Sequence, residues 1–134
     1  MVIIKGRVVQ GCGNFEKRLT RPDFRAAYRK ATGEELCKGT LNVEVNKCIP
    51  VKEHFRIQST EYDDPVHGPK QDLLFEICQI NGLWAYRIRP YVLCTGAGGW
   101  GDHIIEIGCS QEIPDVPVGK EVQIALFRDD IEST

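Results

Sequence analysis

The chain has 134 residues, of which 42% are hydrophobic and 27% are charged, a composition typical of one folded domain and not of a disordered segment. Its 17 basic and 19 acidic side chains give a net charge of −2, which leaves no surplus of positive charge to attract nucleic acid or an acidic membrane surface. No apolar run exceeds four residues, which argues against a membrane span and a signal peptide. We therefore expect a single cytoplasmic domain over residues 1–134 that binds neither nucleic acid nor a membrane.

The cysteines predict no metal site. They occur singly, without a C-x-x-C pair, so the spacings of zinc-ribbon, thioredoxin-like and iron–sulfur proteins are absent. An even number of cysteines also suits a secreted disulfide framework, but a chain of this length can build a core without one. We expect free, mostly buried thiols in a reducing cytosol. The cysteines are Cys12, Cys37, Cys48, Cys78, Cys94 and Cys109.

The N-terminal quarter predicts a strand followed by a helix. Val2–Val9 is rich in β-branched residues, which favours a strand, and it leads into residues 10–14, whose glycines suit unusual backbone angles or a close backbone approach. Pro22 fits the first turn of a helix, and Gly33 is a typical stop. Between them, apolar side chains at helical spacing form one stripe of Phe24, Ala27, Tyr28 and Ala31.

The remainder predicts β structure. Asn81-Gly82 is a strong hairpin signal between Leu73–Ile80 and Leu83–Leu93. Pro90 places the far end of the second strand at an edge or a bend, and we expect Trp84 in the core. Many short antiparallel strands favour a mainly β fold, a small closed barrel, because closure removes exposed strand edges. The other expected strands are Thr40–Val45, Phe55–Thr60, His103–Ile107 and Val122–Phe127.

Thr40 and Asn42 are candidate metal ligands. They are two residues apart in an expected strand, so both side chains point off the same face. Two neutral oxygens are weak ligands by themselves, but they suit Mg²⁺ that arrives with nucleotide phosphates and keeps several waters. On the residues alone, a solvent-facing polar strand is the simpler interpretation.

Glu106 is the candidate acid–base or ligand-orienting residue. It lies among isoleucines directly after the glycine-rich residues 96–101, and a carboxylate in an apolar strand is costly unless it faces a cavity or a partner. Ordinary alternation on a half-exposed strand is the alternative.

The glycine-rich loop at residues 96–101 matches G-x-G-x-x-G, but a β-rich segment follows it where a dinucleotide site needs a helix. We therefore expect either a backbone contact to a ligand or a simple hairpin loop.

The order of these features resembles the archaeal CTP-dependent riboflavin kinases over nearly the whole chain. The features are a strand running into Gly11-x-Gly13, a helix ending at Thr32-Gly33, the tetrapeptide Gly39-Thr40-Leu41-Asn42 and the final Ile104–Ile107. The resemblance implies a six-stranded barrel of the cradle-loop type with one short helix. It also implies Mg²⁺-dependent transfer of the terminal phosphoryl group of CTP to riboflavin, which gives FMN.

The resemblance assigns the site residues. Thr40 and Asn42 would bind Mg²⁺, Glu106 would be catalytic and contact the flavin, and Thr95 and Gly98 would lie at the flavin substrate. The partners are small molecules: riboflavin, FMN and the nucleotide. The nucleotide would be held by Gly11, Cys12, Gly13, Asn14, Phe15, Gly108, Cys109 and Ser110.

The chain departs from this family where the ligands would bind. Asn14-Phe15 stands where a third glycine is usual, Lys38 replaces a proline, and no arginine follows within residues 108–114. These departures and the enlarged loop at 96–101 favour the alternative hypothesis, a non-catalytic barrel that binds a flavin or a nucleotide.

Overall fold

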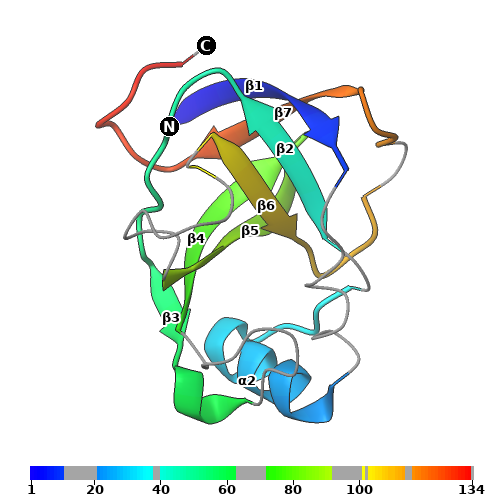
Figure 1. Ribbon diagram of the computed structural model, residues 1–134, viewed down its shortest axis with the longest axis vertical. Helices are drawn as coiled ribbons and strands as arrows, with labels where there is room; N and C mark the ends of the chain where they lie inside the picture. The colour runs from blue at the N-terminus through cyan, green and yellow to red at the C-terminus, as the bar shows by residue number, and fades with distance from the viewer. Residues whose placement is uncertain are drawn as a thin grey trace.

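The computed structural model describes residues 1–10, 21–37, 40–62, 72–91, 101, 103–113 and 116–133. Within these residues the chain forms seven strands, one α-helix and one short 3₁₀ turn (Figure 1). In chain order they are β1 (Val2–Val9), α2 (Pro22–Thr32), β2 (Leu41–Val45), β3 (Phe55–Ile57), η1 (Ser59–Glu61), β4 (Leu73–Ile80), β5 (Leu83–Pro90), β6 (Ile104–Gly108) and β7 (Glu121–Leu126).

The strands form a closed antiparallel barrel. Their order is β3-β4-β5-β6-β2-β1-β7, and β7 pairs back onto β4, with Cys78 opposite Leu126 and Ile80 opposite Ile124. Six strands therefore complete the barrel within the described residues, and β3 lies outside it, paired only with β4. The prediction of a mainly β closed barrel with one short helix is confirmed, whereas the cradle-loop assignment remains a prediction from the resemblance.

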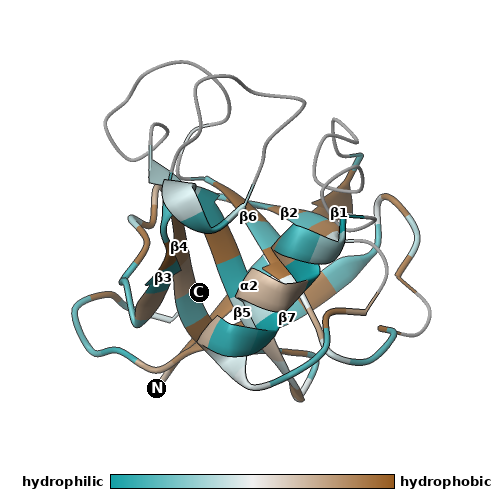
Figure 2. Cartoon of the chain, turned by 90° about the horizontal axis from the view of Figure 1, so that it is seen from below, coloured by the Kyte–Doolittle hydropathy of each residue, from teal (hydrophilic) through white to brown (hydrophobic). Residues whose placement is uncertain are grey.

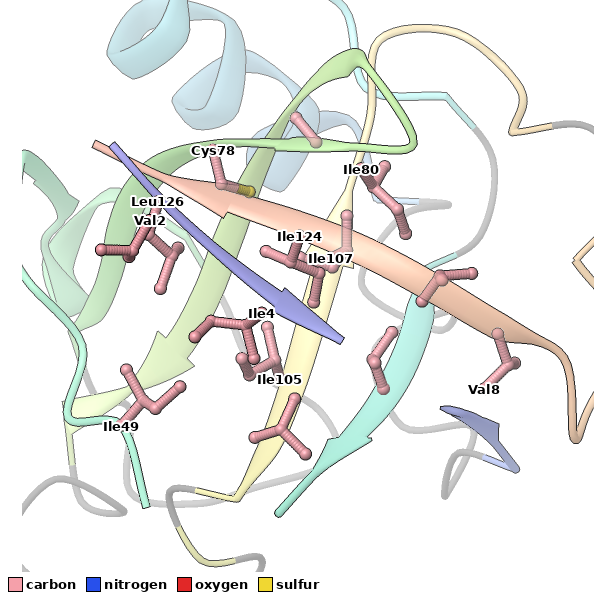
Figure 3. Packing of buried hydrophobic residues seen from close by; sticks show 14 of the residues in the cluster. Val2, Ile4, Val8, Ile49, Cys78, Ile80, Ile105, Ile107, Ile124 and Leu126 are labelled. Atoms are coloured by element: carbon pink, nitrogen blue, oxygen red, sulfur yellow. The ribbon is translucent and has the colours of Figure 1, made fainter. Parts of the chain in front are cut away.

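The barrel interior holds the larger hydrophobic core (Figure 3). Because side chains alternate along a strand, every second residue of each strand points inward and loses its contact with water. A fully buried apolar side chain stabilises the folded state by roughly 1.5–3 kcal/mol relative to an exposed one. The interior residues include Val2, Ile4, Val8, Val43, Cys78, Ile80, Ile105, Ile107, Ile124 and Leu126.

The helix α2 covers the outer face of the barrel at β3, β4 and β5 (Figure 2). It begins with Pro22 and ends at Gly33, whose φ of 77° is left-handed and whose N–H donates to the carbonyl of Arg29. Both predicted helix boundaries are thus confirmed. Tyr28 packs edge-on against Phe75 and Tyr86. The apolar outer faces of β4 and β5 are buried by this contact and form a second core.

The hairpin between β4 and β5 is also confirmed. Asn81 and Gly82 have φ values of 47° and 83°, the pair of left-handed residues that a two-residue type I′ turn requires. The second strand ends at Pro90, earlier than the expected Leu93; residues 92 and 93 lie outside the described part of the chain.

Two expectations about strands and burial were wrong. The strand expected over Phe55–Thr60 stops at Ile57, because Asp72 accepts the N–H of Ser59 and Glu61 accepts that of Gln58, which turns the chain into η1. Trp84 is 59% exposed instead of buried. It lies on the outer face of β5, and it stacks on Phe127 with ring centroids 5.3 Å apart.

A charged group lies in the barrel interior, which the sequence analysis did not predict. Glu76 of β4 and Arg87 of β5 are opposite one another, and both are fully buried. Arg128 Nη1 donates to Glu76 Oε2 at 3.3 Å and to the carbonyl of Pro50 at 2.8 Å. Buried charges are tolerated when they are paired in this way.

In the part of the chain described, no helix is long and apolar enough to cross a membrane.

Candidate functional site

Thr40, Asn42 and Glu106 come together where β2 and β6 lie side by side (Figure 1). Asn42 is directly opposite Glu106 in the antiparallel register, so their side chains leave the same face of the sheet with Cβ atoms roughly 5 Å apart. The hydroxyl of Thr40 donates to Glu106 Oε2 at 3.1 Å. The three side chains are half-buried. The carboxylate of Glu106 therefore has a polar partner, and its half-buried position between buried Ile105 and Ile107 follows the ordinary alternation of a strand. Its role at a ligand remains a prediction.

This oxygen set fits a hard cation such as Mg²⁺. A threonine hydroxyl has one proton and two lone pairs, so a hydroxyl that gives its proton to Glu106 keeps its lone pairs for a metal. An amide oxygen and a carboxylate lie beside it, and Mg²⁺ prefers oxygen ligands while it retains water and phosphate oxygens. Among the described residues, no three His, Cys, Asp or Glu side chains gather as a metal-binding group. Any Mg²⁺ at Thr40 and Asn42 would consequently need ligand oxygens from elsewhere, which a nucleotide supplies.

The strand that leads toward the first glycine segment ends at this site. Val9, the last residue of β1, is opposite Asn42, and Gln10 precedes Gly11 in the sequence. The predicted nucleotide-binding residues Gly11, Cys12, Gly13, Asn14 and Phe15 and the predicted substrate-binding residues Thr95 and Gly98 lie outside the described residues.

A pocket of about 140 Å³ opens beside Thr40. Cys109, one of the residues predicted to hold the nucleotide, forms part of its wall. The pocket therefore connects a predicted metal ligand with a predicted nucleotide-binding segment. Its lining residues are Cys37, Thr40, Leu41, Ile107, Cys109, Gln111, Glu112, Ile113 and Val116.

Gly108 allows two apolar side chains to pack close to the backbone of β6. A Cβ at this position would lie 2.9 Å from Ile88 Cδ1 and 3.2 Å from Leu36 Cδ1. Glycine lets the chain after α2 pack directly against the end of β6. As a result, Leu36 stays buried and the segment that follows Gly108 runs beside residues 34–37.

Glu34 holds the next part of this segment in place. Its Oε2 accepts hydrogen bonds from the Ser110 hydroxyl at 3.0 Å and from the Tyr86 hydroxyl at 2.7 Å. Burial raises the pKa of Tyr86, and the hydrogen bond to Glu34 raises that pKa further. The tyrosine proton is thus retained, and the hydroxyl keeps its role as a donor.

Sequence reasoning missed several residues of this region. Glu34 and Cys37 follow the helix in a polar stretch, and Gln111 and Glu112 lie in an irregular segment, so no period or motif marks them. Tyr86 looks like any aromatic strand residue. Only the contact between residues 34–37 and residues 108–110 reveals them as neighbours of the predicted site.

In comparisons with known proteins, no family model matches the chain and no curated protein matches it.

Proposed function

We propose that this protein is a Mg²⁺-dependent phosphotransferase that moves the terminal phosphoryl group of a nucleotide, CTP by the resemblance, to riboflavin and so produces FMN. The observation that carries the proposal is the hydrogen bond from Thr40 to Glu106 with Asn42 in register beside them. Three residues assigned to the metal and to catalysis from separate parts of the sequence are neighbours in the barrel wall.

The chemistry required of the protein is modest. Phosphoryl transfer depends mainly on positioning and on neutralising charge on the phosphate oxygens, and bound Mg²⁺ would supply that neutralisation. Glu106 would accept the proton of the primary hydroxyl of riboflavin. That oxygen forms a bond to the terminal phosphorus as the bond from phosphorus to the bridging oxygen breaks, and the nucleoside diphosphate leaves.

The positions of the remaining described residues support the same assignment. Thr40 and Cys109 share one pocket, and Glu34 fixes Ser110 beside it. A nucleotide held at residues 108–110 would have its phosphates directed toward Thr40 and Asn42. Cytoplasmic location and small-molecule partners remain predictions that accompany this function.

The decisive experiment incubates the purified protein with riboflavin and Mg²⁺, with CTP and ATP in parallel, and separates the products by chromatography. We expect FMN with at least one nucleotide, and loss of most of it in Asn42→Ala. Glu44→Gln is the matched control, because Glu44 lies on the same face of β2, is exposed and is opposite Ile104 instead of Glu106. Absence of FMN with every nucleotide tested would refute the kinase assignment.

The same samples test the alternative function. A barrel that binds a flavin or a nucleotide without turnover would quench flavin fluorescence, or release heat with nucleotide in calorimetry, and yield no FMN. The missing arginine in residues 108–114 is the observation that favours this alternative, because an arginine is a common partner for phosphate oxygens.

A further inference from the structure

Cys37 and Cys109 meet at the wall of the pocket. They belong to distant parts of the sequence, one after α2 and the other after β6. The N–H of Cys37 donates to the carbonyl of Cys109 at 2.8 Å, and both residues line the same cavity.

The backbone contact makes the two residues direct neighbours across two separate segments. One hydrogen bond joins their main chains and both side chains border the same cavity. Both thiols are free. A disulfide requires two cysteines that lie side by side in this way, with Cα atoms about 4.4–6.8 Å apart.

We infer that Cys37 and Cys109 form an oxidative modification site that closes to a reversible disulfide when the protein meets a peroxide. In the first step Cys37 releases its thiol proton and its sulfur attacks one peroxide oxygen, the O–O bond breaks, and the departing hydroxide takes up the released proton, so that a sulfenic acid and water form. In the second, Cys109 sulfur attacks the sulfenic sulfur, the S–O bond breaks, and its proton leaves with the hydroxide as water. Two thiols and one hydrogen peroxide become one disulfide and two waters.

The order of the two steps follows from exposure. Cys37 is half-buried and therefore within reach of a small oxidant, whereas Cys109 is only 3% exposed. Burial, together with the nearby Cys37 and Glu34, raises the pKa of Cys109 to about 11, which keeps it a protonated thiol at neutral pH. Cys109 is thereby protected from direct attack by the oxidant, and it acts as the resolving cysteine, the one that attacks the sulfenic acid of Cys37.

The bridge would join two segments that shape the pocket. Residue 37 follows the helix that covers the barrel, and residue 109 precedes the segment that contributes Gln111 and Glu112 to the pocket lining. Covalent closure limits how far these segments can separate. The inference does not depend on the proposed phosphotransferase activity, because its readout is the chemical state of the cysteines.

The test treats the folded, reduced protein with a small excess of hydrogen peroxide and maps its peptides without reduction. Trypsin releases Cys37 in peptide 31–38, and a second protease that cleaves before Asp102 and Asp115 isolates Cys109 in peptide 102–114, away from Cys94. We expect these two peptides to be joined, with a loss of two hydrogens and with loss of thiol labelling at both cysteines. Dithiothreitol should restore both peptides.

Three variants sharpen the result. Cys37→Ser and Cys109→Ser should both lack the joined peptide, and Cys48→Ser should form it as the wild type does, since Cys48 is an exposed cysteine away from the pocket. If a variant fails to fold, the peptide map of the oxidised wild-type protein still tests the inference. Cys37 found as a sulfinic acid while Cys109 remains open to alkylation, or Cys37 joined to any other cysteine, would overturn the inference.

Discussion

The hydroxyl of Thr40 donates its proton to Oε2 of Glu106 across the boundary between β2 and β6, at 3.1 Å. This bond determines which way the lone pairs of the threonine oxygen point, and it holds the glutamate carboxylate opposite Asn42. The proposed cation site and the proposed proton acceptor are thereby linked through one hydrogen atom.

Removal of the Thr40 hydroxyl should reduce turnover. Thr40→Val keeps the shape of the side chain but removes the lone pairs and the donor, so we expect FMN formation to fall roughly 10²-fold, similar to the loss of one transition-state contact. The activity should recover partly at high Mg²⁺. Thr40→Ser is the control and should retain most of the activity; a fully active Thr40→Val would remove Thr40 from the site.

Glu106→Gln tests the role of the carboxylate. The amide keeps the size and the hydrogen-bonding position of the side chain but cannot accept a proton, so the rate constant kcat should fall by about 10²–10⁴-fold. The dissociation constant for riboflavin, measured by fluorescence quenching, should change little. An equal loss of binding and turnover would assign Glu106 to substrate binding alone.

The buried carboxylate of Glu76 should be important for stability. Its Oε1 accepts the N–H of Lys52 at 3.0 Å, and its Oε2 faces Arg128 at 3.3 Å. Glu76→Gln removes the negative charge from a barrel interior that also holds Arg87. Loss of one member of such a group costs roughly 3–5 kcal/mol, which urea denaturation would measure as a lower midpoint.

The control for that experiment is Glu53→Gln. Glu53 pairs with Arg56 at the surface, where an ion pair contributes about 1 kcal/mol or less. An equal effect of the two substitutions would show that the buried group has no special importance.

Gly6→Ala should destabilise the barrel wall. A Cβ on Gly6 would lie 2.5 Å from Val43 Cγ1 and 2.6 Å from the carbonyl oxygen of Glu44. The second atom belongs to the backbone of β2, which cannot move without disturbing the pairing of Gly6 with Val45. We expect a loss of roughly 1–3 kcal/mol by urea denaturation. Arg7→Ala, at an exposed position of the same strand, should lower the free energy of unfolding far less. If Gly6→Ala left the free energy of unfolding unchanged, the two strands would be able to separate locally.

Stability should fall at alkaline pH. Burial raises the pKa of Cys109 from the usual 9.0 to about 11, and it also raises the pKa values of Cys78, Tyr28 and Tyr86. Each group binds its proton more tightly in the folded chain than in the unfolded chain, so unfolding releases protons above the unfolded pKa. The stabilisation is complete below pH 9.0 and is lost progressively toward about pH 11.

Urea midpoints measured across that range, under reducing conditions, would check the alkaline prediction. Cys109→Ser removes one of the titrating groups and should flatten the dependence in part. A wild-type urea midpoint that stays constant up to about pH 11 would contradict the prediction that buried groups with a raised pKa lower the stability at alkaline pH.

Local features of the chain were predictable because they depend on neighbours in the sequence. Pro22 and Gly33 delimit a helix through backbone geometry alone, and Asn81-Gly82 can take the left-handed angles of a tight turn. Alternation of apolar residues then predicted most of the strands. The choice of Thr40, Asn42 and Glu106 as candidates also came from local sequence.

The tertiary structure decided which of these residues meet. The barrel order places β6 beside β2, which brings Glu106 to Thr40, and the chain after α2 lies against the end of β6, which brings Cys37 to Cys109. It also decided that Trp84 is exposed, since α2 covers the outer face of β5 at Tyr86 and Ile88 and leaves the start of the strand uncovered. It decided as well that Glu76 and Arg128 pair inside the barrel. Such contacts join residues far apart in sequence, and they depend on strand order and register, which local backbone preferences do not determine.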